Sequence, residues 1–296
     1  MASLKEIKGR INSVKSTRKI TSAMKMVSSV KLRTAQNRIE NFLPYQQHLT
    51  SIMNNFLYSV TDYTSPLFEK QSAETEKQPV KKIAIVVISS NSGLCGAYNS
   101  SIIKLLNQTI RDYPHIPREN IYIYPIGKKV EDAVVKDGRN VMGSFVKLMD
   151  KPNFEGAKNI ADSLIADFRA KKFDKAFLLY NHFRNTGFQS STKEQFLPIQ
   201  FTPPQDAKAI PADYIVEPDE RTILDTLIPK SLRIKLYAGV LDSAAAEQAA
   251  RTAAMQTATE NANEILSDLT VQYNKQRQQA ITNELLDIIG GSEAQK

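Results

Sequence analysis

The feature that most constrains this chain is a C-terminal window without helix-breaking residues. No proline follows Pro229, and no glycine lies between Gly239 and Gly290. Alanine, the strongest helix former, recurs there in pairs and a triplet. The pattern predicts one helix of about 60 to 70 residues between Asp219 and Ile289, which at 1.5 Å per residue is about 90–105 Å long. A domain of this size cannot wrap such a helix, so we expect it to project and to need a partner helix or a surrounding protein.

A second long helix is predicted at the N-terminus, over residues 3–59. Its apolar stripe, spaced by threes and fours with two polar residues in the middle, consists of Leu4, Ile7, Ile11, Val14, Arg18, Thr21, Met24, Val27, Ala35, Ile39 and Phe42. Pro44 should kink or interrupt this helix. Two long helices with narrow apolar stripes satisfy each other best by pairing antiparallel. The stripe is not a strict heptad, so it does not give a supercoil pitch.

Between the helices, the sequence changes character. Residues 61–81 are polar and proline-marked, which predicts a linker. Residues 82–201 alternate β-branched runs with amphipathic stretches, which is typical of a doubly wound α/β domain. The predicted strands are Ile83–Ile88, Ile121–Ile126 and Lys175–Tyr180, and the predicted helices are Asn99–Asp112, Lys128–Lys136 and a stretch marked by Ile160 to Phe168. The α/β domain is therefore expected as an insertion between residues 1–60 and residues 219–296, with residues 202–218 as the return segment.

The positive charge of the chain is concentrated at its N-terminus. Residues 1–40 hold ten Lys or Arg against two Glu, and the resulting +8 equals the net charge of the whole chain. A basic helix of this kind predicts an acidic neighbour, which could be nucleic acid, anionic lipid or an acidic protein surface; a solvated coiled-coil face is the alternative. The sequence contains no run of eighteen apolar residues, so we predict no membrane span, and we expect no cleaved targeting segment. The single cysteine, Cys95, excludes an internal disulfide framework and suits a reducing compartment.

One loop lies where α/β folds bind phosphates. Residues 89–99 follow a predicted strand and open a predicted helix, but they match neither GxxxxGK[ST] nor GxGxxG. A nucleotide site is therefore possible in principle, and a tight strand-to-helix turn that needs glycine is favoured. Cys95 in this loop could be a nucleophile, although no histidine is near in sequence and a buried inert thiol is favoured.

Other reactive residues form no recognisable constellation. His48, His115 and His182 stand alone, without metal-site spacing. Asp219 and Glu220 lie at a helix start, where a capping role is sufficient. We therefore expect no catalytic, cofactor-binding or metal-binding residues in this chain.

Several stretches, in order along nearly the full chain, resemble the gamma subunit of F-type ATP synthases. They are Ile7–Ile11, Lys19–Val27, Gly93–Asn99, Glu247–Arg251 and Tyr273–Leu285. The resemblance implies a long antiparallel coiled coil of the N- and C-terminal helices with an inserted Rossmann-like α/β domain at its base. The implied function is a rotor shaft that couples rotation of a proton-driven c ring to ATP synthesis or hydrolysis at the beta subunits, and that regulates ATPase activity and proton flow.

The resemblance also implies partners. They are three alpha and three beta subunits, the epsilon subunit and the membrane c ring, with one copy of this chain per complex. It implies no binding to nucleic acid, and contact with the membrane only through the c ring. The chain lacks the second cysteine and the redox loop of chloroplast relatives, so thiol switching is not expected. A bacterial origin, at the cytoplasmic face of the inner membrane, is favoured, and a processed mitochondrial chain remains an alternative.

Site residues follow from the resemblance only where the motifs match. The resemblance implies that the basic N-terminal helix faces the acidic lever segment of the beta subunits. The implied contacts with the beta subunits are Met24, Lys25, Arg277, Gln278, Thr282 and Glu284. The implied hydrophobic bearing is Ile281, Leu285, Leu286, Ile288 and Ile289. The implied foot on the c ring is Tyr214 and Glu217.

Two other functions remain open from the residues alone. A nucleic-acid-binding coiled coil would explain the basic helix, although a basic-region zipper needs parallel heptads beyond the basic segment. A nucleotide-dependent enzyme would explain the α/β domain, and it predicts equilibrium binding of ATP or NAD.

Overall fold

The computed structural model describes residues 3–59, 65–68, 80–200, 216–217 and 219–293, without the side chains of 55–59, 220 and 290–293. Most of the expected linker and return segment therefore lies outside the described residues. The chain forms two compact units. The first unit joins Met1–Ser29 to Arg251–Lys296, and the second unit is Val30–Ala250. Each unit has its own packing.

Both predicted long helices are present. Helix α1 spans Leu4–Ser59 and helix α6 spans Glu220–Glu293, with 56 and 74 residues. Pro44 was expected to kink or interrupt the first helix, and it does not interrupt it, because α1 continues through it to Ser59. Proline removes one backbone donor, and a long helix tolerates that loss when its other hydrogen bonds are intact.

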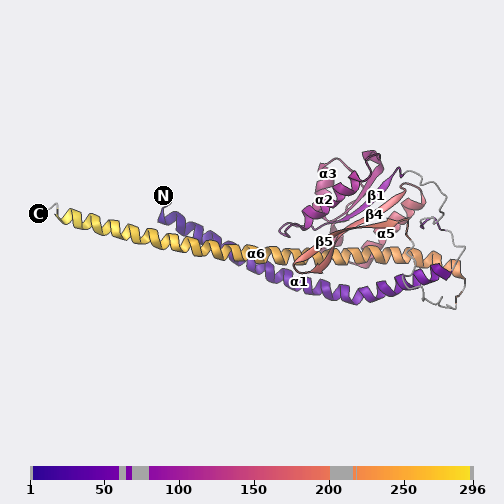
Figure 1. Ribbon diagram of the computed structural model, residues 1–296, viewed down its shortest axis with the longest axis horizontal. Coiled ribbons are helices and arrows are strands. Elements are labelled where there is room, and N and C mark those ends of the chain that lie inside the picture. Colours follow the sequence, from indigo (N-terminus) through magenta and orange to yellow (C-terminus); the bar gives the residue numbers. More distant parts are fainter. Residues whose placement is uncertain (1–2, 60–64, 69–79, 201–215, 218, 294–296) are drawn as a thin grey trace. The chain divides into compact units, whose positions relative to one another are not determined.

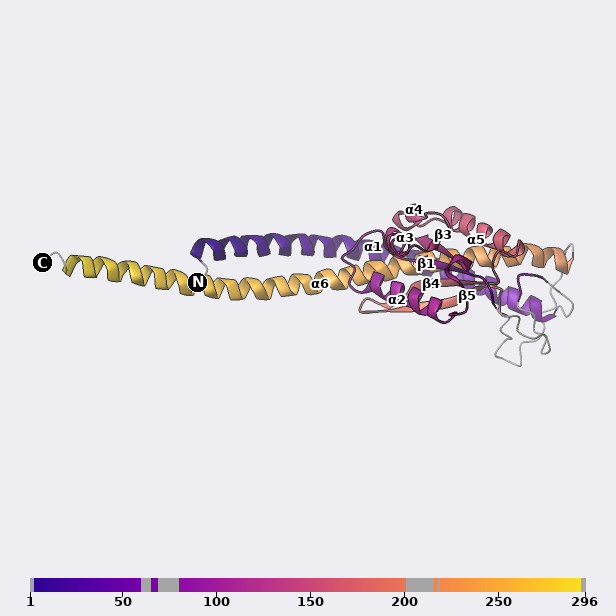
Figure 2. The ribbon, with the colours of Figure 1, turned by 90° about the horizontal axis from the view of Figure 1, so that it is seen from above.

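In the first unit, α1 and α6 pack side by side (Figure 2). The hydroxyls of Thr21 and Thr259 share a hydrogen bond of 2.8 Å, and Arg18 Nη1 donates to Asn263 Oδ1 at 3.2 Å. The partner number on α6 rises as the number on α1 falls, so the pairing is antiparallel, as predicted.

The seam of the first unit follows a heptad spacing that the apolar residues alone do not reveal. A set of protected positions on α1 alternates steps of four and three, at Ile7, Ile11, Val14, Arg18, Thr21, Lys25 and Ser28, and Ser22, Met24 and Ser29 beside it are half-buried as well. Positions on α6 do the same, at Met255, Thr259, Ala262, Leu266, Leu269, Tyr273, Gln276 and Ala280. The predicted stripe already contained Arg18 and Thr21, and it left the heptad spacing only after them, because it continued to Met24 and Val27 whereas the seam continues to Lys25 and Ser28. Val27, assigned to that stripe, is 57% exposed.

The second unit contains a five-stranded sheet of order β3-β2-β1-β4-β5 (Figure 1). Its first four strands are parallel, and β5 is antiparallel to β4. The strands are β1 (Ile83–Ile88), β2 (Ile121–Ile126), β3 (Asn140–Val141), β4 (Lys175–Asn185) and β5 (Phe188–Leu197). The shorter helices are α2 (Tyr98–Arg111), the 3-10 turn Arg118–Asn120, α3 (Lys128–Lys136), α4 (Val146–Asp150) and α5 (Phe154–Arg169).

The α/β prediction is confirmed, with additions. The predicted strands β1 and β2 and helix α3 have the predicted bounds, while β4 runs five residues longer than predicted. Strands β3 and β5 and helix α4 were not predicted. Strand β5 was missed because its middle, Gln189–Gln195, is polar and lacks the apolar run of a buried strand.

The sheet is covered on both faces. Helices α2 and α3 bury Ile102, Leu106, Val130 and Val134 against one face. The other face is covered by α5 and by the start of α6, which contributes Leu224, Ile228, Leu232, Leu236 and Val240 at four-residue steps. The long C-terminal helix is therefore itself a layer of the α/β domain.

The N-terminus of α6 has a side-chain cap, as predicted for Asp219. Its carboxylate accepts hydrogen bonds from the N–H of Thr222 at 2.9 Å and from the Thr222 hydroxyl at 2.7 Å. These bonds hold the pKa of Asp219 below its ordinary value. The ionised carboxylate therefore stabilises the helix start above the unfolded-state pKa, and this is lost as pH falls through the lower folded-state pKa.

We predict that Asp219→Ala accelerates amide hydrogen exchange in the first turn of α6 at pH 7, because the Thr222 N–H loses its acceptor. Asp219→Asn should retain most of the protection, since asparagine also caps helices. The difference between the Asn variant and the unchanged chain should shrink below about pH 4. Equal exchange in the Ala variant and the unchanged chain would contradict the cap.

Candidate functional site

The loop between β1 and α2 attaches the α/β domain to the middle of α6. Leu94 and Gly96 adopt positive φ angles of 63° and 57°, which turn the chain toward the start of α2. Asn99 fixes the turn, because its Oδ1 accepts hydrogen bonds from the Ser90 N–H at 3.1 Å and the Ser90 hydroxyl at 3.0 Å. The turn presents Cys95 and Tyr98 to α6, where they pack against Ala246 and Ala250.

Tyr98 makes the polar part of this attachment. Its hydroxyl donates to the carbonyl oxygen of Ser243 at 3.0 Å and shares a 2.6 Å hydrogen bond with the Ser243 hydroxyl. Burial, followed by the nearby charge of Glu247, raises the pKa of Tyr98 far above its usual range. The phenol therefore keeps its proton and remains a donor.

This packing favours the turn interpretation of the loop over a nucleotide site. Ligands of α/β sheets bind outside the carboxyl ends of the strands, next to loops such as this one. Here the alanines of α6 lie against the loop. The Cys95 side chain is 2% exposed, and Asn99 Nδ2 lies 3.2 Å from its sulfur. A thiol in this environment is a packing residue.

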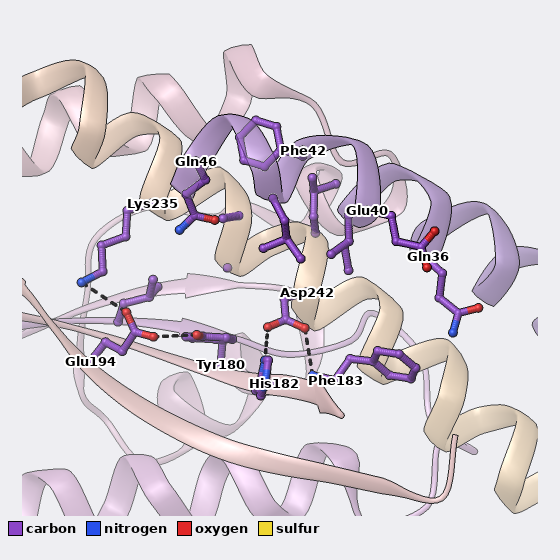
Figure 3. A pocket seen from close by; sticks show the side chains of 16 residues that line it. Gln36, Glu40, Phe42, Gln46, Tyr180, His182, Phe183, Glu194, Lys235 and Asp242 are labelled. Atoms are coloured by element: carbon purple, nitrogen blue, oxygen red, sulfur yellow. Dashed lines mark hydrogen bonds and ion pairs between the residues drawn. The ribbon is translucent and has the colours of Figure 1, made fainter. Parts of the chain in front are cut away.

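Two further sets of polar contacts join α6 to the rest of the second unit. On α5, Asp162 Oδ1 accepts from Arg233 Nε at 2.6 Å. On β4, His182 Nδ1 lies 2.5 Å from Asp242 Oδ2, and the Phe183 N–H donates to Asp242 Oδ1 at 2.8 Å (Figure 3). Burial raises the pKa of Asp242, although the hydrogen bonds from His182 and Phe183 oppose the shift. With the hydrogen bonds of Tyr98, residues of α2, α5 and β4 therefore all make polar contacts with α6.

The expected contact residues at the tip of α6 are all exposed. They are Arg277, Gln278, Thr282 and Glu284. The five bearing residues are exposed as well, at 48% for Ile281, 54% for Leu285, 60% for Leu286, 67% for Ile288 and 58% for Ile289. The protected stripe of α6 ends at Ala280, so no described residue of this chain covers the apolar tip.

The other expected contact residues differ in their surroundings. Met24 and Lys25 are half-buried on α1, and Lys25 occupies a seam position. Glu217 is exposed, whereas Tyr214 lies outside the described residues. Sequence reasoning missed an exposed apolar group on α1, formed by Ile20 (60%), Met26 (62%) and Val27 (57%). A strict heptad register on α1 would have placed all three outside the seam.

The described residues offer neither a metal-binding cluster nor a membrane-spanning helix. These residues contain no group of three or more His, Cys, Asp and Glu side chains that could hold a metal ion. Within the described helices, no stretch is long and apolar enough to cross a bilayer.

Comparison with known proteins identifies relatives over the full chain. A family model described as ATP synthase matches residues 3–295. The ATP synthase gamma chain of Azobacteroides pseudotrichonymphae is 51% identical over 298 residues and covers 100% of both chains. The ATP synthase gamma chain of Bacteroides fragilis is 50% identical, over 99% of this chain and 100% of its own.

A solved structure has a similar fold. One chain of the Euglena gracilis mitochondrial ATP synthase, in a structure of its OSCP, F1 and c-ring parts, aligns with a TM-score of 0.67 and 20% identity. The alignment covers 98% of this chain and 94% of that chain.

We predict that Tyr98→Phe lowers the free energy of unfolding by about 1–2 kcal/mol, because the buried Ser243 hydroxyl and carbonyl lose their partner. A double-mutant cycle with Ser243→Ala should give a coupling of about 1 kcal/mol. Tyr122→Phe, at a half-buried tyrosine of strand β2, is the matched control and should change stability by less than about 0.5 kcal/mol. Additive effects of Tyr98→Phe and Ser243→Ala would show that the two side chains do not stabilise each other.

Proposed function

The chain belongs to the family of ATP synthase gamma chains, and from that premise we propose that it is the central shaft of an F-type ATP synthase. In this role it couples proton-driven rotation of a c ring to ATP synthesis or hydrolysis at three beta subunits, which alternate with three alpha subunits. It performs no bond chemistry itself. The single observation that carries the proposal is the bare apolar tip of α6, which in a free protein would be an aggregation hazard.

The tip suits a bearing inside a surrounding ring. Ile281, Leu285 and Ile288 follow one another at steps of four and three, so they share one face of the helix. Leu286 and Ile289 extend the apolar surface to a neighbouring face, which makes contact possible over a wide arc. A collar of apolar side chains from the alpha and beta subunits would bury this surface without fixing one angular position.

Polar residues next to the bearing suit a grip on the beta subunits. Arg277, Gln278 and Thr282 are exposed and lie within about one and a half turns, and Glu284 follows on the next turn. Arginine and amide side chains form directional hydrogen bonds that are strong when one partner is charged. The basic α1 adds a long positive surface, including Lys5, Lys8 and Lys15, that complements an acidic segment of a beta subunit.

The shaft can act only through unequal contacts. A ligand or partner shifts a conformational equilibrium by the difference in its interaction energy with the two states. The polar and apolar surfaces of α6 and α1 are unevenly distributed around the coiled coil, so each orientation offers a different surface to a given beta subunit. We infer that this asymmetry regulates ATP turnover and proton flow.

The second unit suits the base of the shaft. There, α6 is a layer of the α/β domain and is tied to it through Tyr98, Arg233 and Asp242. These contacts resist rotation of the helix within the domain. We propose that this base, with Tyr214 and Glu217 as its foot, rests on the c ring and binds an epsilon subunit. One copy per complex, at the cytoplasmic face of a bacterial inner membrane, fits this arrangement.

We predict that Arg277→Ala combined with Gln278→Ala reduces coupled ATP turnover of the assembled complex by about tenfold, because charge-assisted contacts with the beta subunits are lost. Turnover would be measured in membrane vesicles that contain the full complex. The thermal unfolding of the isolated chain should not change, since both side chains are exposed.

Asn274→Ala combined with Lys275→Ala is the matched control, because these residues are also exposed on α6 and lie outside the proposed grip. Normal activity of the Arg277 and Gln278 variant, or an equal loss in the control, would remove the grip from these two residues. Co-purification of the chain in single copy with a heterohexameric ATPase tests the wider proposal.

A further inference from the structure

A cavity of about 330 Å³ lies inside the second unit, between α1, the β4–β5 hairpin and α6. Its volume is at the lower end of the range for small-molecule pockets. Much of its lining is apolar and comes from three elements, with Phe42 and Leu43 on α1, Leu178 and Phe183 on β4, and Leu241 on α6 (Figure 3). Nothing in the shaft role requires an unfilled space at this position.

The wall opposite α1 carries two separate sets of polar and charged side chains. Asp242 contacts His182 and the Phe183 N–H, as described above. Glu194 accepts from the Tyr180 hydroxyl at 2.6 Å and lies 3.2 Å from Lys235 Nζ. Figure 3 shows both carboxylates on the same side of the cavity.

The charges around the cavity leave an excess of carboxylates. Asp242, Glu194 and Glu40 line it, and they face one lysine, Lys235, and His182. Each oxygen of an ionised carboxylate can accept two hydrogen bonds, and each Asp242 oxygen accepts one described bond. The Asp242 side chain is 18% exposed, so a ligand in the cavity can reach it.

We propose that this cavity binds a small amphipathic amine, with its apolar body against α1 and β4 and its protonated nitrogen at the Asp242 carboxylate. An apolar pocket with a few convergent polar groups is the usual form of a small-molecule site. A cation offsets the cost of keeping a partly buried carboxylate ionised, for which Asp242 otherwise has the contacts with His182 Nδ1 and the Phe183 N–H. The bound amine would bridge α1 to the sheet and to α6, and so stabilise the second unit. The proposal does not depend on the shaft role.

The test uses the purified full-length chain and three probes that share one apolar body. These are 1-adamantylmethylamine, the neutral 1-adamantylmethanol and the anionic 1-adamantanecarboxylate, each titrated by calorimetry at pH 7. We expect the amine to bind at least about tenfold more tightly than the alcohol, which is the usual gain from a charged hydrogen bond. We expect the carboxylate to bind more weakly than both. Absence of amine binding, or equal binding of all three probes, would overturn the proposal.

Two variants place the amine at the proposed position. Asp242→Asn should weaken amine binding by about tenfold and leave alcohol binding unchanged, whereas Asp132→Asn, an exposed carboxylate on α3, should change neither. Leu43 lines the cavity, so Leu43→Trp should fill part of it and reduce binding of both the amine and the alcohol. Circular dichroism establishes whether each variant is folded. If Asp242→Asn does not fold, the proposal is tested by the three probes on the unchanged chain and by Leu43→Trp. Amine binding that persists in Leu43→Trp would place it elsewhere and contradict the proposal.

Discussion

The fold of this chain depends on one apolar stripe, Leu224 to Val240 of α6, buried against the sheet of the α/β domain. The five side chains at four-residue steps in this stripe are each no more than 1% exposed. Full burial of a leucine or isoleucine contributes about 1.5–3 kcal/mol, so the stripe is among the larger stabilising contributions in the second unit. Because of it, a helix of 74 residues is a structural layer of the domain at one end.

The start, the middle and the tip of α6 therefore differ in what their side chains contact. The first part of α6 is apolar on the side that faces the sheet. Buried or half-buried polar contacts also join it to the α/β domain, and together they hold the helix in one orientation about its axis relative to the sheet. Its middle uses alanine and short polar side chains, so α1 can approach closely and pair through a heptad seam. Its tip, from Ile281 onward, has no covering residue in the described part of the chain. A single helix thus has a start buried against the sheet, a middle paired with α1 and an exposed apolar tip.

Much of this was predictable from the sequence, because long helices and buried parallel strands have strong local signals. The absence of proline and glycine after Gly239 predicted α6, and the β-branched run at Ile83–Ile88 predicted the central strand. The end of the heptad seam was hidden, since Lys25 and Ser28 occupy positions that pattern reasoning assigned to the neighbouring apolar residues Met24 and Val27. Strand β5 was hidden for a related reason, as its polar residues are typical of a loop. The cavity beside Asp242 depends on side chains from α1, β4, β5 and α6, and their convergence is set by tertiary packing alone.

The most direct test of the account is native-state amide hydrogen exchange of the isolated chain. If the start of α6 is a layer of the domain, amides of residues 228–240 should open with the same free energy as those of β1 and β4, through global unfolding. Amides of residues 281–289 should exchange far faster. Exchange of residues 228–240 at a clearly lower free energy than the sheet would show that the helix is only docked on the domain, and would contradict the account.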